Sequence, residues 1–374
     1  MNLIERCEKH LTAIKDSGLW RKLKSPSVES VDLSSNDYLG LANDERLKSA
    51  MIAEIERSGC GSTGSRLLRG EREIFARAEN RFAEFKKTER SLFFSSGYAA
   101  NIGVLTAFLE AGDVVFSDEL NHASLIDGIR LAKAERVVFP HNNAAALEKL
   151  IQETPSQGQR FLVVESLFSM DGDIAPLDNY NRICREYNVA LIIDEAHAVG
   201  VFGENGSGLI EEYGIAQDVF LSINTAGKAL GVSGAFVAGA GAAIELLIQR
   251  ARPFIFSTAP TPAVCAALIE AIEIVEKEPD RRQKLLRLSE FLRTELKQNG
   301  IAVSSENSQI IPIIIGASEK AVAIAERLQT AGYDVRAIRP PTVPVRSARL
   351  RISLNSNLDD EFVWKFVKTL KSTL

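Results

Sequence analysis

Three side chains capable of acid–base chemistry follow two apolar runs in the middle of the sequence. The run "ALIID" ends at Asp194, His197 stands three residues further on, and Lys228 follows the run "DVFLSIN". Runs that are apolar almost throughout are typical of strands buried on both faces of a mostly parallel sheet. Because ligands of such sheets bind at the carboxyl ends of the strands, we expect the three side chains to face one crevice.

Nucleotide-binding motifs of two other protein classes are incomplete here. The letters D-E-A-H at residues 194–197 also occur in ATP-driven helicases, but such a motor needs G-x-x-x-x-G-K-[ST] ahead of the acid. The only Gly-Lys pair follows the acid, with Ser222 in place of the first glycine and Ala229 after the lysine. Residues 59–64 satisfy G-x-G-x-x-G, but a helical pattern precedes them, which predicts a loop. With a net charge of −5 and no dense Lys/Arg cluster, the sequence argues against an ATP motor and a nucleic-acid partner.

A carboxylate and an amine at one crevice suit pyridoxal 5′-phosphate (PLP). The amine can form a Schiff base with the cofactor's aldehyde, and the carboxylate can keep the pyridine nitrogen protonated. The phosphate needs an anion site, and "FFSSGYAANIG" leads a strand into a helix at Gly97 and Tyr98, where backbone N–H groups are unpaired. Thr225 adds a hydroxyl, and His122 begins another predicted helix, from which it can lie flat on a cofactor ring. The sequence therefore predicts a PLP site.

The rest of the sequence predicts the frame that positions these residues. Helical patterns cover 3–14, 44–57, 97–111, 123–133, 143–154, 177–187, 261–299, 320–332 and 359–372. Extended runs cover 31–35, 90–96, 113–118, 135–140, 160–166, 189–194, 218–224, 234–239, 301–305, 310–316, 333–338 and 349–354. The alternation predicts an N-terminal helix and arm (1–43), a large α/β domain with a mostly parallel sheet flanked by helices (44–278), and a smaller C-terminal α+β domain (279–374).

The composition is that of a globular protein, with 45% apolar and 25% charged residues in a chain of 374. Its four cysteines have no metal-binding spacing, so we expect buried free thiols and no metal. Residues 1–20 lack the apolar block of a secretory signal, and no uncharged apolar run is long enough to span a membrane. These features predict a cytoplasmic protein without a membrane partner.

Over nearly its whole length the sequence resembles the α-oxoamine synthases, which are fold-type I PLP enzymes that condense an amino acid with an acyl thioester. The blocks that carry the resemblance are "SSNDYLGLAND", "GSTGSRLLRGE", "SSGYAANIGVL", "NHASLIDGIR", "ESLFSMDGDIAPL", "IIDEAHAVGVFGENGSG", "TAGKALGVSGAFVAG", "FIFSTAPTP" and "AIRPPTVP". The resemblance implies a PLP-dependent transferase that forms a homodimer with active sites shared between subunits.

The resemblance also implies a role for each residue of the crevice. Lys228 would carry the Schiff base and act as the acid–base group at the substrate Cα, while Asp194 would pair with the pyridine nitrogen. His197 and Ser169 would hydrogen-bond near the phenolic oxygen of the ring, and His122 would stack on the ring.

The cofactor phosphate and the substrates would be held by other blocks. Gly97, Tyr98 and Thr225 would hold the cofactor's edge and phosphate. Ser257 and Thr258 would reach the phosphate of the neighbouring subunit.

Arg339 would clamp the amino-acid carboxylate, because a planar guanidinium can pair with it through two hydrogen bonds. Thr342 and Arg21 would contact the acyl chain, with Arg21 facing its distal carboxylate. The sequence departs from the family pattern in a shortened segment after Arg21, and in Val345 and Arg346, which stand where small residues are usual.

Within the family, "KALGVSGAFVAG" and "AIRPPTVP" favour the member of the biotin pathway, which condenses L-alanine with pimeloyl-CoA or pimeloyl-acyl carrier protein and releases CO2. The first alternative is a glycine C-acetyltransferase, and the second is a synthase with a long-chain acyl donor. A cofactor-binding protein without catalysis is the third, and the intact set of Lys228, Asp194, His197 and Arg339 argues against it.

Overall fold

The computed structural model describes residues 2–25, 27 and 29–374, and its chain forms two compact units. The larger unit comprises residues 36–169 and 173–284. The smaller unit comprises the described residues up to Ser35 together with 170–172 and 285–374. These units join the N-terminal segment to the C-terminal part of the chain, and the three-part division at 43/44 and 278/279 stays a prediction.

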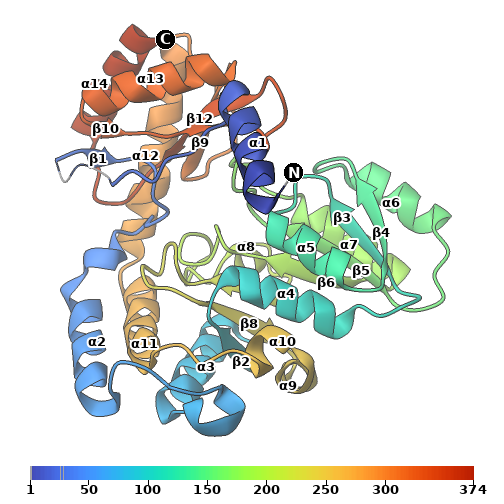
Figure 1. The fold of residues 1–374 in the computed structure, drawn as a ribbon. Coiled ribbons are helices and arrows are strands. Elements are labelled where there is room, and N and C mark those ends of the chain that lie inside the picture. The colour runs from blue at the N-terminus through green and yellow to red at the C-terminus, as the bar shows by residue number, and fades with distance from the viewer. Residues whose placement is uncertain (1, 26, 28) are drawn as a thin grey trace. The chain divides into compact units, whose positions relative to one another are not determined.

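A seven-stranded sheet forms the centre of the larger unit (Figure 1). Its order is β2-β8-β7-β6-β5-β3-β4, and all neighbours are parallel except β8, which is antiparallel to both β2 and β7. The strands are β2 (Arg90–Phe94), β3 (Val114–Asp118), β4 (Glu135–Phe139), β5 (Arg160–Glu165), β6 (Ala190–Asp194), β7 (Val219–Thr225) and β8 (Ala235–Gly239). The predicted α/β class with a mostly parallel sheet is confirmed.

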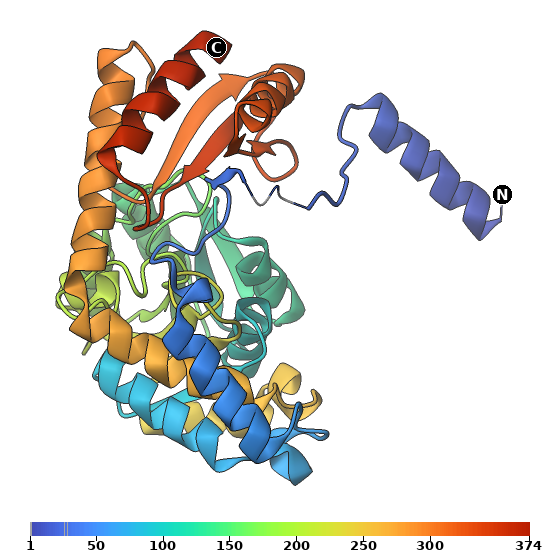
Figure 2. The ribbon, with the colours of Figure 1, turned by 90° about the vertical axis from the view of Figure 1, so that its left-hand side faces the viewer.

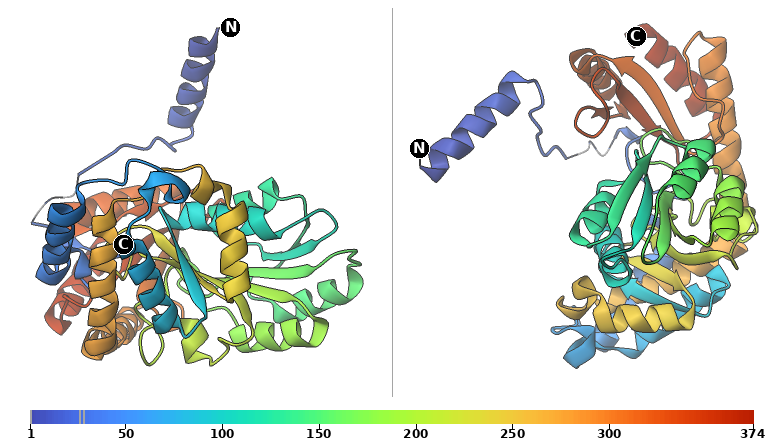
Figure 3. Two further views of the ribbon diagram at one scale, coloured as in Figure 1. Left: turned by 90° about the horizontal axis from the view of Figure 1, so that it is seen from below. Right: turned by 90° about the vertical axis from the view of Figure 1, so that its right-hand side faces the viewer.

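Helices cover both faces of this sheet (Figure 3). The helices of the larger unit are α2 (Glu45–Ser58), α3 (Glu73–Lys86), α4 (Gly97–Phe108), α5 (Ala123–Leu131), α6 (Ala144–Glu153), α7 (Leu177–Tyr187), α8 (Leu209–Glu212), α9 (Gly241–Arg250), α10 (Arg252–Ile255) and α11 (Pro262–Lys277). On one face, α4, α5, α9 and α10 enclose an apolar core that includes Val237 of β8. The neighbouring Phe236 faces the other way and stacks on Phe82 of α3, with ring centroids 4.2 Å apart.

The smaller unit contains a three-stranded antiparallel sheet of order β11-β12-β9, and a separate parallel pair of β1 and β10 (Figure 2). Its elements are α1 (Leu3–Asp16), β1 (Val31–Asp32), β9 (Ile310–Gly316), α13 (Ser318–Thr330), β10 (Tyr333–Asp334), β11 (Ala337–Ile338), β12 (Ala348–Ser353) and α14 (Asp360–Thr373). Helix α12 (Pro279–Gln298) contributes its first residues to the larger unit and the rest to this one. Phe291 of α12 packs edge-to-face against Trp364 of α14.

Several local predictions differ from the structure. Residues 301–305 form no strand, because the Arg293 guanidinium donates hydrogen bonds to the carbonyl and hydroxyl oxygens of Ser304 and so ties this segment to α12. The run 333–338 is interrupted and forms the short strands β10 and β11. Helix α3 was not predicted, although Phe75, Ala78 and Phe82 recur at the spacing of a buried helix face.

The burial of the cysteines agrees only in part with the predicted buried thiols. Cys184 and Cys265 are buried as expected, whereas Cys7 and Cys60 are exposed because both lie in segments whose neighbours face solvent. Burial raises the pKa of the Cys184 thiol to about 12.

Within the ranges that the structure describes, no helix is both long enough and apolar enough to cross a membrane.

Candidate active site

Polar side chains gather where the central strands of the large sheet end. Asp194 is the last residue of β6, Glu165 is the last residue of β5, and Thr225 is the last residue of β7. Glu165 and Asp194 are register partners across the parallel β5–β6 pair, so their Cα atoms lie side by side. The carboxyl edge of the sheet therefore presents two adjacent carboxyl groups, of which only Asp194 was predicted from the sequence.

Asp194 is a buried carboxylate whose oxygens accept hydrogen bonds from neutral groups. Its Oδ1 accepts from the backbone N–H of Ala196 at 2.9 Å, and its Oδ2 accepts from Asn101 Nδ2 at 2.8 Å. Only 5% of the residue is exposed, and no ion pair of Asp194 occurs among the residues that the structure describes. A buried negative charge is costly without a cationic partner, so this carboxylate is suited to a positively charged ligand.

A hydrogen-bonded chain connects Asp194 to His122. The Asn101 amide that reaches Asp194 also donates to Ser124 Oγ at 2.8 Å, and this hydroxyl lies 2.7 Å from His122 Nδ1. The backbone N–H of Ser124 donates to the same Nδ1, which makes Nδ1 an acceptor and places the proton of the neutral ring on Nε2. Burial lowers the pKa of His122, and the nearby Lys228 charge adds to this effect while Asp194 opposes it.

Lys228 belongs to a second hydrogen-bonded chain. Its Nζ lies 2.8 Å from His197 Nε2, and His197 Nδ1 lies 2.6 Å from the hydroxyl of Tyr38. The Tyr38 hydroxyl donates to Asn36 Oδ1 at 3.0 Å. When Lys228 is an ammonium group it donates to His197 Nε2, and the other ring nitrogen then carries the proton toward Tyr38. The predicted pair of Lys228 and His197 is thus brought into direct contact.

A buried ion pair holds the segment that follows Asp194. The ammonium group of Lys86 lies 2.5 Å from Glu195 Oε2 and donates to the carbonyl oxygen of Ser207 at 2.6 Å. The other oxygen of Glu195 accepts from the backbone N–H of Ile210 at 2.9 Å. Both side chains are almost completely buried, so removing one partner would leave an uncompensated charge beside the site.

Glu165 is a second buried carboxyl group of the site, and its ionised form is unfavourable. Only 3% of the residue is exposed, and its Oε1 has no hydrogen-bond partner in the described part of the chain. Burial, followed by the charge of Asp194, raises the pKa of Glu165 to about 8, although Lys228 and the backbone N–H groups of His122 and Ser169 favour the charged form. Glu165 is therefore mostly protonated at neutral pH.

This raised pKa predicts a pH-dependent stability. The folded protein keeps a proton on Glu165 between its ordinary pKa of 4.5 and about 8, whereas the unfolded chain releases it. The free energy of unfolding therefore falls as pH rises through this window, by up to about 1.4 kcal/mol per pH unit. In urea unfolding of the cofactor-free protein, we expect Glu165→Gln to gain stability relative to the wild type between pH 5 and pH 8.

The control for this measurement is Glu153→Gln, which changes an exposed glutamate of α6. We expect it to follow the wild-type curve at every pH. Parallel curves for Glu165→Gln and the wild type would show that Glu165 does not hold a proton at neutral pH.

The predicted phosphate seat is formed by the start of α4 and the end of β7. Helix α4 begins at Gly97, and its N-cap residue Ser96 accepts from the backbone N–H of Ala99 at 3.1 Å. A Cβ atom at Gly97 would collide with the hydroxyl oxygen of Thr225, so glycine permits this close approach. Tyr98 is half-exposed and its hydroxyl donates to Asp127. The unpaired N–H groups of α4 and the Thr225 hydroxyl thus lie together.

Ser257 and Thr258 lie in the same unit, beyond the end of β2. Together with Ser95 they line a small hollow. The glycine-rich loop at 59–64 holds the following residues, because the backbone N–H of Ala259 donates to the carbonyl oxygen of Gly64 at 2.9 Å. The prediction that this glycine pattern follows a helix and not a strand is confirmed, since α2 precedes it.

Arg21, Arg339 and Thr342 belong to the smaller unit. The guanidinium group of Arg339 donates to the carbonyl oxygens of Gly18 and Trp20, at 2.7 and 3.3 Å. Arg21 and Arg339 both line one cavity of about 630 Å³, and Thr342 is exposed. Their predicted contacts with substrate remain predictions.

Comparisons with known proteins identify the family of the chain. The aminotransferase class I and II family model matches residues 28–370. An 8-amino-7-oxononanoate synthase from Geobacter sulfurreducens is 43% identical over 363 residues, which cover 94% of this chain and 93% of that protein.

Two solved structures also resemble the chain. A serine palmitoyltransferase from S. paucimobilis with bound PLP–myriocin is 26% identical, has a TM-score of 0.93, and covers 100% of this chain and 98% of its own. An 8-amino-7-oxononanoate synthase from Francisella tularensis is 30% identical, has a TM-score of 0.81, and covers 92% of this chain and 98% of its own.

The chain belongs to the aminotransferase class I and II family of fold-type I PLP enzymes. The resemblance to the α-oxoamine synthases is confirmed, because relatives named 8-amino-7-oxononanoate synthase match it over most of its length.

Proposed function

We propose that this chain is a PLP-dependent acyltransferase of biotin biosynthesis that condenses L-alanine with a pimeloyl thioester. The products are 8-amino-7-oxononanoate, CO2 and the free thiol carrier, which is coenzyme A or acyl carrier protein. The observation that carries the proposal is the contact of Lys228 with His197 beside a buried Asp194 that lacks a cationic partner among the described residues. The names of the relatives support the choice of substrates.

The residues of the site fit PLP. Asp194 offers a buried carboxylate for the protonated pyridine nitrogen, and Lys228 offers an amine for the aldehyde. Gly97, Tyr98 and Thr225 offer backbone N–H groups and a hydroxyl for the phosphate, with glycine required at the contact with Thr225. When bound, PLP draws electron density away from the amino-acid Cα and so stabilises negative charge there.

Lys228 is the group that we assign to proton movement at Cα. Its Nζ would remove the Cα proton of alanine. The chain from His197 through Tyr38 to Asn36 orients this amine and can accept or return its proton. The neutral ring of His122 suits stacking on the cofactor, because the cofactor ring carries a positive charge when its nitrogen is protonated. Ser169 and His197 would hydrogen-bond to the phenolic oxygen.

The bond changes balance without a further reactant. After losing its proton to Lys228, the alanine Cα forms a bond to the carbonyl carbon of the thioester. The carbon–sulfur bond breaks, and the thiolate leaves with a proton. The bond between Cα and the alanine carboxylate then breaks to give CO2, and Cα takes up a proton, so one proton is consumed overall.

Arg339 is proposed to clamp the alanine carboxylate, with Thr342 and Arg21 contacting the pimeloyl chain. Arg339→Ala is expected to raise the KM for alanine about tenfold and to leave kcat within about twofold, because the lost charge-assisted hydrogen bonds form in the ground state as well as in the transition state. Steady-state kinetics with varied alanine measures this effect.

A matched variant separates Arg339 from Arg351, one of the two buried arginines of β12. Arg351 is only 7% exposed, and its guanidinium donates to Ser353 Oγ at 2.6 Å. If Arg351→Ala raises the KM for alanine while Arg339→Ala does not, the clamp is Arg351 and the sequence-based choice of Arg339 is wrong. Circular dichroism checks that each variant is folded.

We also propose a cytoplasmic homodimer in which Ser257 and Thr258 serve the phosphate of the neighbouring subunit. The support is their position at the end of a loop held by the glycine-rich segment, together with the family to which the chain belongs. Analytical ultracentrifugation of the PLP-loaded protein tests the dimer.

The experiment that tests the proposed function is thiol release across a small substrate matrix. Alanine, glycine and serine are combined with acetyl-CoA, pimeloyl-CoA, palmitoyl-CoA and pimeloyl-acyl carrier protein, and products are identified by mass spectrometry. We expect alanine with a pimeloyl thioester to give the highest kcat/KM. Preference for glycine with acetyl-CoA, or for serine with palmitoyl-CoA, would overturn the assignment of substrates while keeping the assignment of the cofactor site.

A further inference from the structure

His141 lies between two carboxylates that belong to different segments of the larger unit. Its Nδ1 lies 2.9 Å from Asp118 Oδ1, and its Nε2 lies 2.6 Å from Asp173 Oδ2. A neutral imidazole has one N–H group, so only a protonated ring can donate to both carboxylates. Burial alone would lower the pKa of His141, but the hydrogen bonds and charges of Asp118 and Asp173 raise it to about 10. His141 is therefore a cation at neutral pH.

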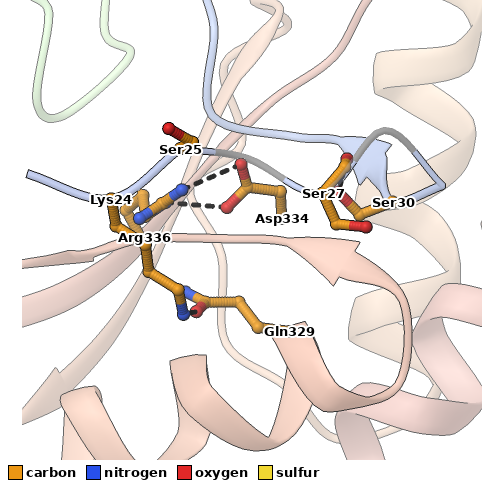
Figure 4. A pocket seen from close by; sticks show the side chains of 7 residues that line it. All are labelled: Lys24, Ser25, Ser27, Ser30, Gln329, Asp334 and Arg336. Carbon is orange, nitrogen blue, oxygen red and sulfur yellow. Dashed lines mark hydrogen bonds and ion pairs between the residues drawn. The ribbon is translucent and has the colours of Figure 1, made fainter.

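This contact joins segments that are far apart in the chain. For comparison, Arg336 of the smaller unit pairs with both oxygens of Asp334, at 2.7 and 3.0 Å, only two positions away (Figure 4). That ion pair stiffens one short segment. The His141 ring instead connects the ends of β3 and β4 to the turn that follows β5.

The Asp118 side of the contact leads to His122. Asp118 is the last residue of β3, and its Oδ1 also accepts from the backbone N–H of Leu120 at 2.8 Å. Its Oδ2 accepts from the backbone N–H of Asn142 at 2.9 Å, so the residue after His141 binds the same carboxylate. These bonds fix the turn that precedes His122, the N-cap residue of α5.

The Asp173 side of the contact leads to Ser169. The backbone N–H of Phe168 donates to the carbonyl oxygen of Asp173 at 3.0 Å, which pairs the two residues across a turn. The buried ring of Phe168 also meets the His141 ring edge-to-face, with ring centroids 4.4 Å apart. Ser169 directly follows Phe168, so its position depends on both contacts.

His122 and Ser169 are themselves neighbours, because the carboxyl group of Glu165 accepts hydrogen bonds from the backbone N–H groups of both. A displacement of one segment is therefore transmitted to the other.

Other titratable groups around His141 leave its charge in place. Glu119 Oε1 accepts from the backbone N–H of His141 at 2.9 Å. Burial, followed by the charges of Asp118 and Asp173, raises the pKa of Tyr180 on α7, so this phenol stays neutral. The positive charge of the ring is thus balanced by the two carboxylates that it contacts.

We propose that His141 is a positioning residue of the PLP site: its protonated ring holds the segment before His122 against the segment that carries Ser169, and so sets both side chains on the cofactor ring. This inference rests on the proposed function, because it uses the roles proposed there for His122 and Ser169. His141 acts through these neighbours and is not assigned to the reacting atoms. A neutral side chain at position 141 would leave the charges of Asp118 and Asp173 uncompensated where the segments meet.

The absorbance of bound PLP reports the position of Ser169 without any turnover. A hydrogen bond donated to the phenolic oxygen stabilises its negative charge, so loss of that bond moves protonation of the bound cofactor to higher pH. For His141→Gln, we expect the midpoint of the absorbance titration to rise by about half a pH unit to one unit, the size of one hydrogen bond. PLP affinity, measured by equilibrium dialysis, is expected to fall about fivefold, because His122 stacks less well on the ring. In the active enzyme kcat is expected to fall about ten- to hundredfold.

The variant Ser169→Ala tests whether His141 acts through Ser169. We expect Ser169→Ala to raise the midpoint by itself, and His141→Gln to raise it no further in that background. Shifts that add in the double variant would overturn the proposal. An unchanged midpoint and an unchanged PLP affinity in His141→Gln would also overturn it.

The control variant is His10→Gln, which changes an exposed histidine of α1. It is expected to leave the midpoint, the PLP affinity and turnover as in the wild type, and circular dichroism checks that each variant is folded. If His141→Gln does not fold, Asp173→Asn takes its place, because it removes one of the two charges and keeps an acceptor oxygen. We expect a smaller rise of the midpoint for Asp173→Asn, and no rise would overturn the proposal.

These absorbance and binding measurements need no amino acid and no thioester, so they separate this inference from the proposed function. A raised midpoint in His141→Gln of a protein that turns over no pimeloyl thioester would retain the positioning role and reject the proposed substrates. An active enzyme whose His141→Gln variant keeps the wild-type midpoint would do the reverse.

Discussion

Lys228→Ala is expected to lower turnover of alanine and pimeloyl thioester by at least about 10³-fold. A positioned acid–base group contributes about 10²- to 10⁴-fold by itself, and this lysine is also the proposed attachment point of the cofactor. Its Nζ lies 2.8 Å from His197 Nε2, and alanine leaves nothing in place of the amine. The measurement is kcat from thiol release, with the wild type and the variant loaded with PLP to the same occupancy.

Loss of turnover must be distinguished from loss of the cofactor or of the fold. The proposed phosphate seat at Gly97 and Thr225 does not involve the lysine side chain, so the variant is expected to keep measurable PLP affinity. Equilibrium dialysis gives this affinity, and circular dichroism reports the fold. The matched control is Lys149→Ala, which removes an exposed lysine of α6 and should retain normal turnover. Normal turnover by PLP-loaded Lys228→Ala would remove Lys228 from the mechanism.

Asp194→Asn is expected to lower turnover by about 10²- to 10⁴-fold while leaving most of the fold intact. An amide is neutral, so it cannot stabilise a protonated pyridine nitrogen as a carboxylate does. It also has only one acceptor oxygen, whereas Asp194 accepts from both Ala196 and Asn101, so some loss of stability is expected as well. Turnover should fall by a larger factor than the loss of stability alone would cause.

Exchange of the alanine Cα proton in deuterated water measures removal of this proton separately from the later steps. This is the step that Asp194 is proposed to support. The exchange needs no acyl donor, and NMR follows it directly in the PLP-loaded protein. We expect Asp194→Asn to slow the exchange by the same factor as turnover. Asp178→Asn, which changes an exposed aspartate at the start of α7, should exchange at the wild-type rate. Wild-type exchange in Asp194→Asn would show that the carboxylate is not the partner of the ring nitrogen.

Much of the fold could be predicted because its signals are local. The runs "FLVVE" and "ALIID" are apolar on both faces, which is what strands of a covered parallel sheet require, and they form β5 and β6. Asp194 and Thr225 end their strands at the same edge of the sheet, as the position of the apolar runs indicated. Glu165 ends β5 in the same way, so the same signal could have found it.

The supporting residues of the site could not be predicted in this way. Tyr38 and His197 are 159 positions apart in the chain, and no pattern in either segment reveals that their side chains meet. Asn101 lies on α4 and reaches Asp194 on β6, which depends on how the helix packs on the sheet. Contacts of this kind follow from tertiary packing, and a single sequence contains no local signal for them.

In the segment 301–305, a local signal predicted a strand that does not form. "IAVSS" has strand-forming residues, yet the structure gives it no strand because the guanidinium group of Arg293 binds Ser304. Local propensity predicted an extended strand, and a hydrogen bond from α12 determined the observed conformation.

Lys228 is proposed to be the residue that binds PLP. Borohydride reduction of the PLP-loaded protein, followed by peptide mass spectrometry, tests it most directly, because reduction makes the link between the lysine and the cofactor permanent. We expect a single major modified peptide, "AGKALGVSGAF", with the added mass on Lys228. Major modification of another lysine, or an active and PLP-loaded protein with no modified lysine, would contradict it.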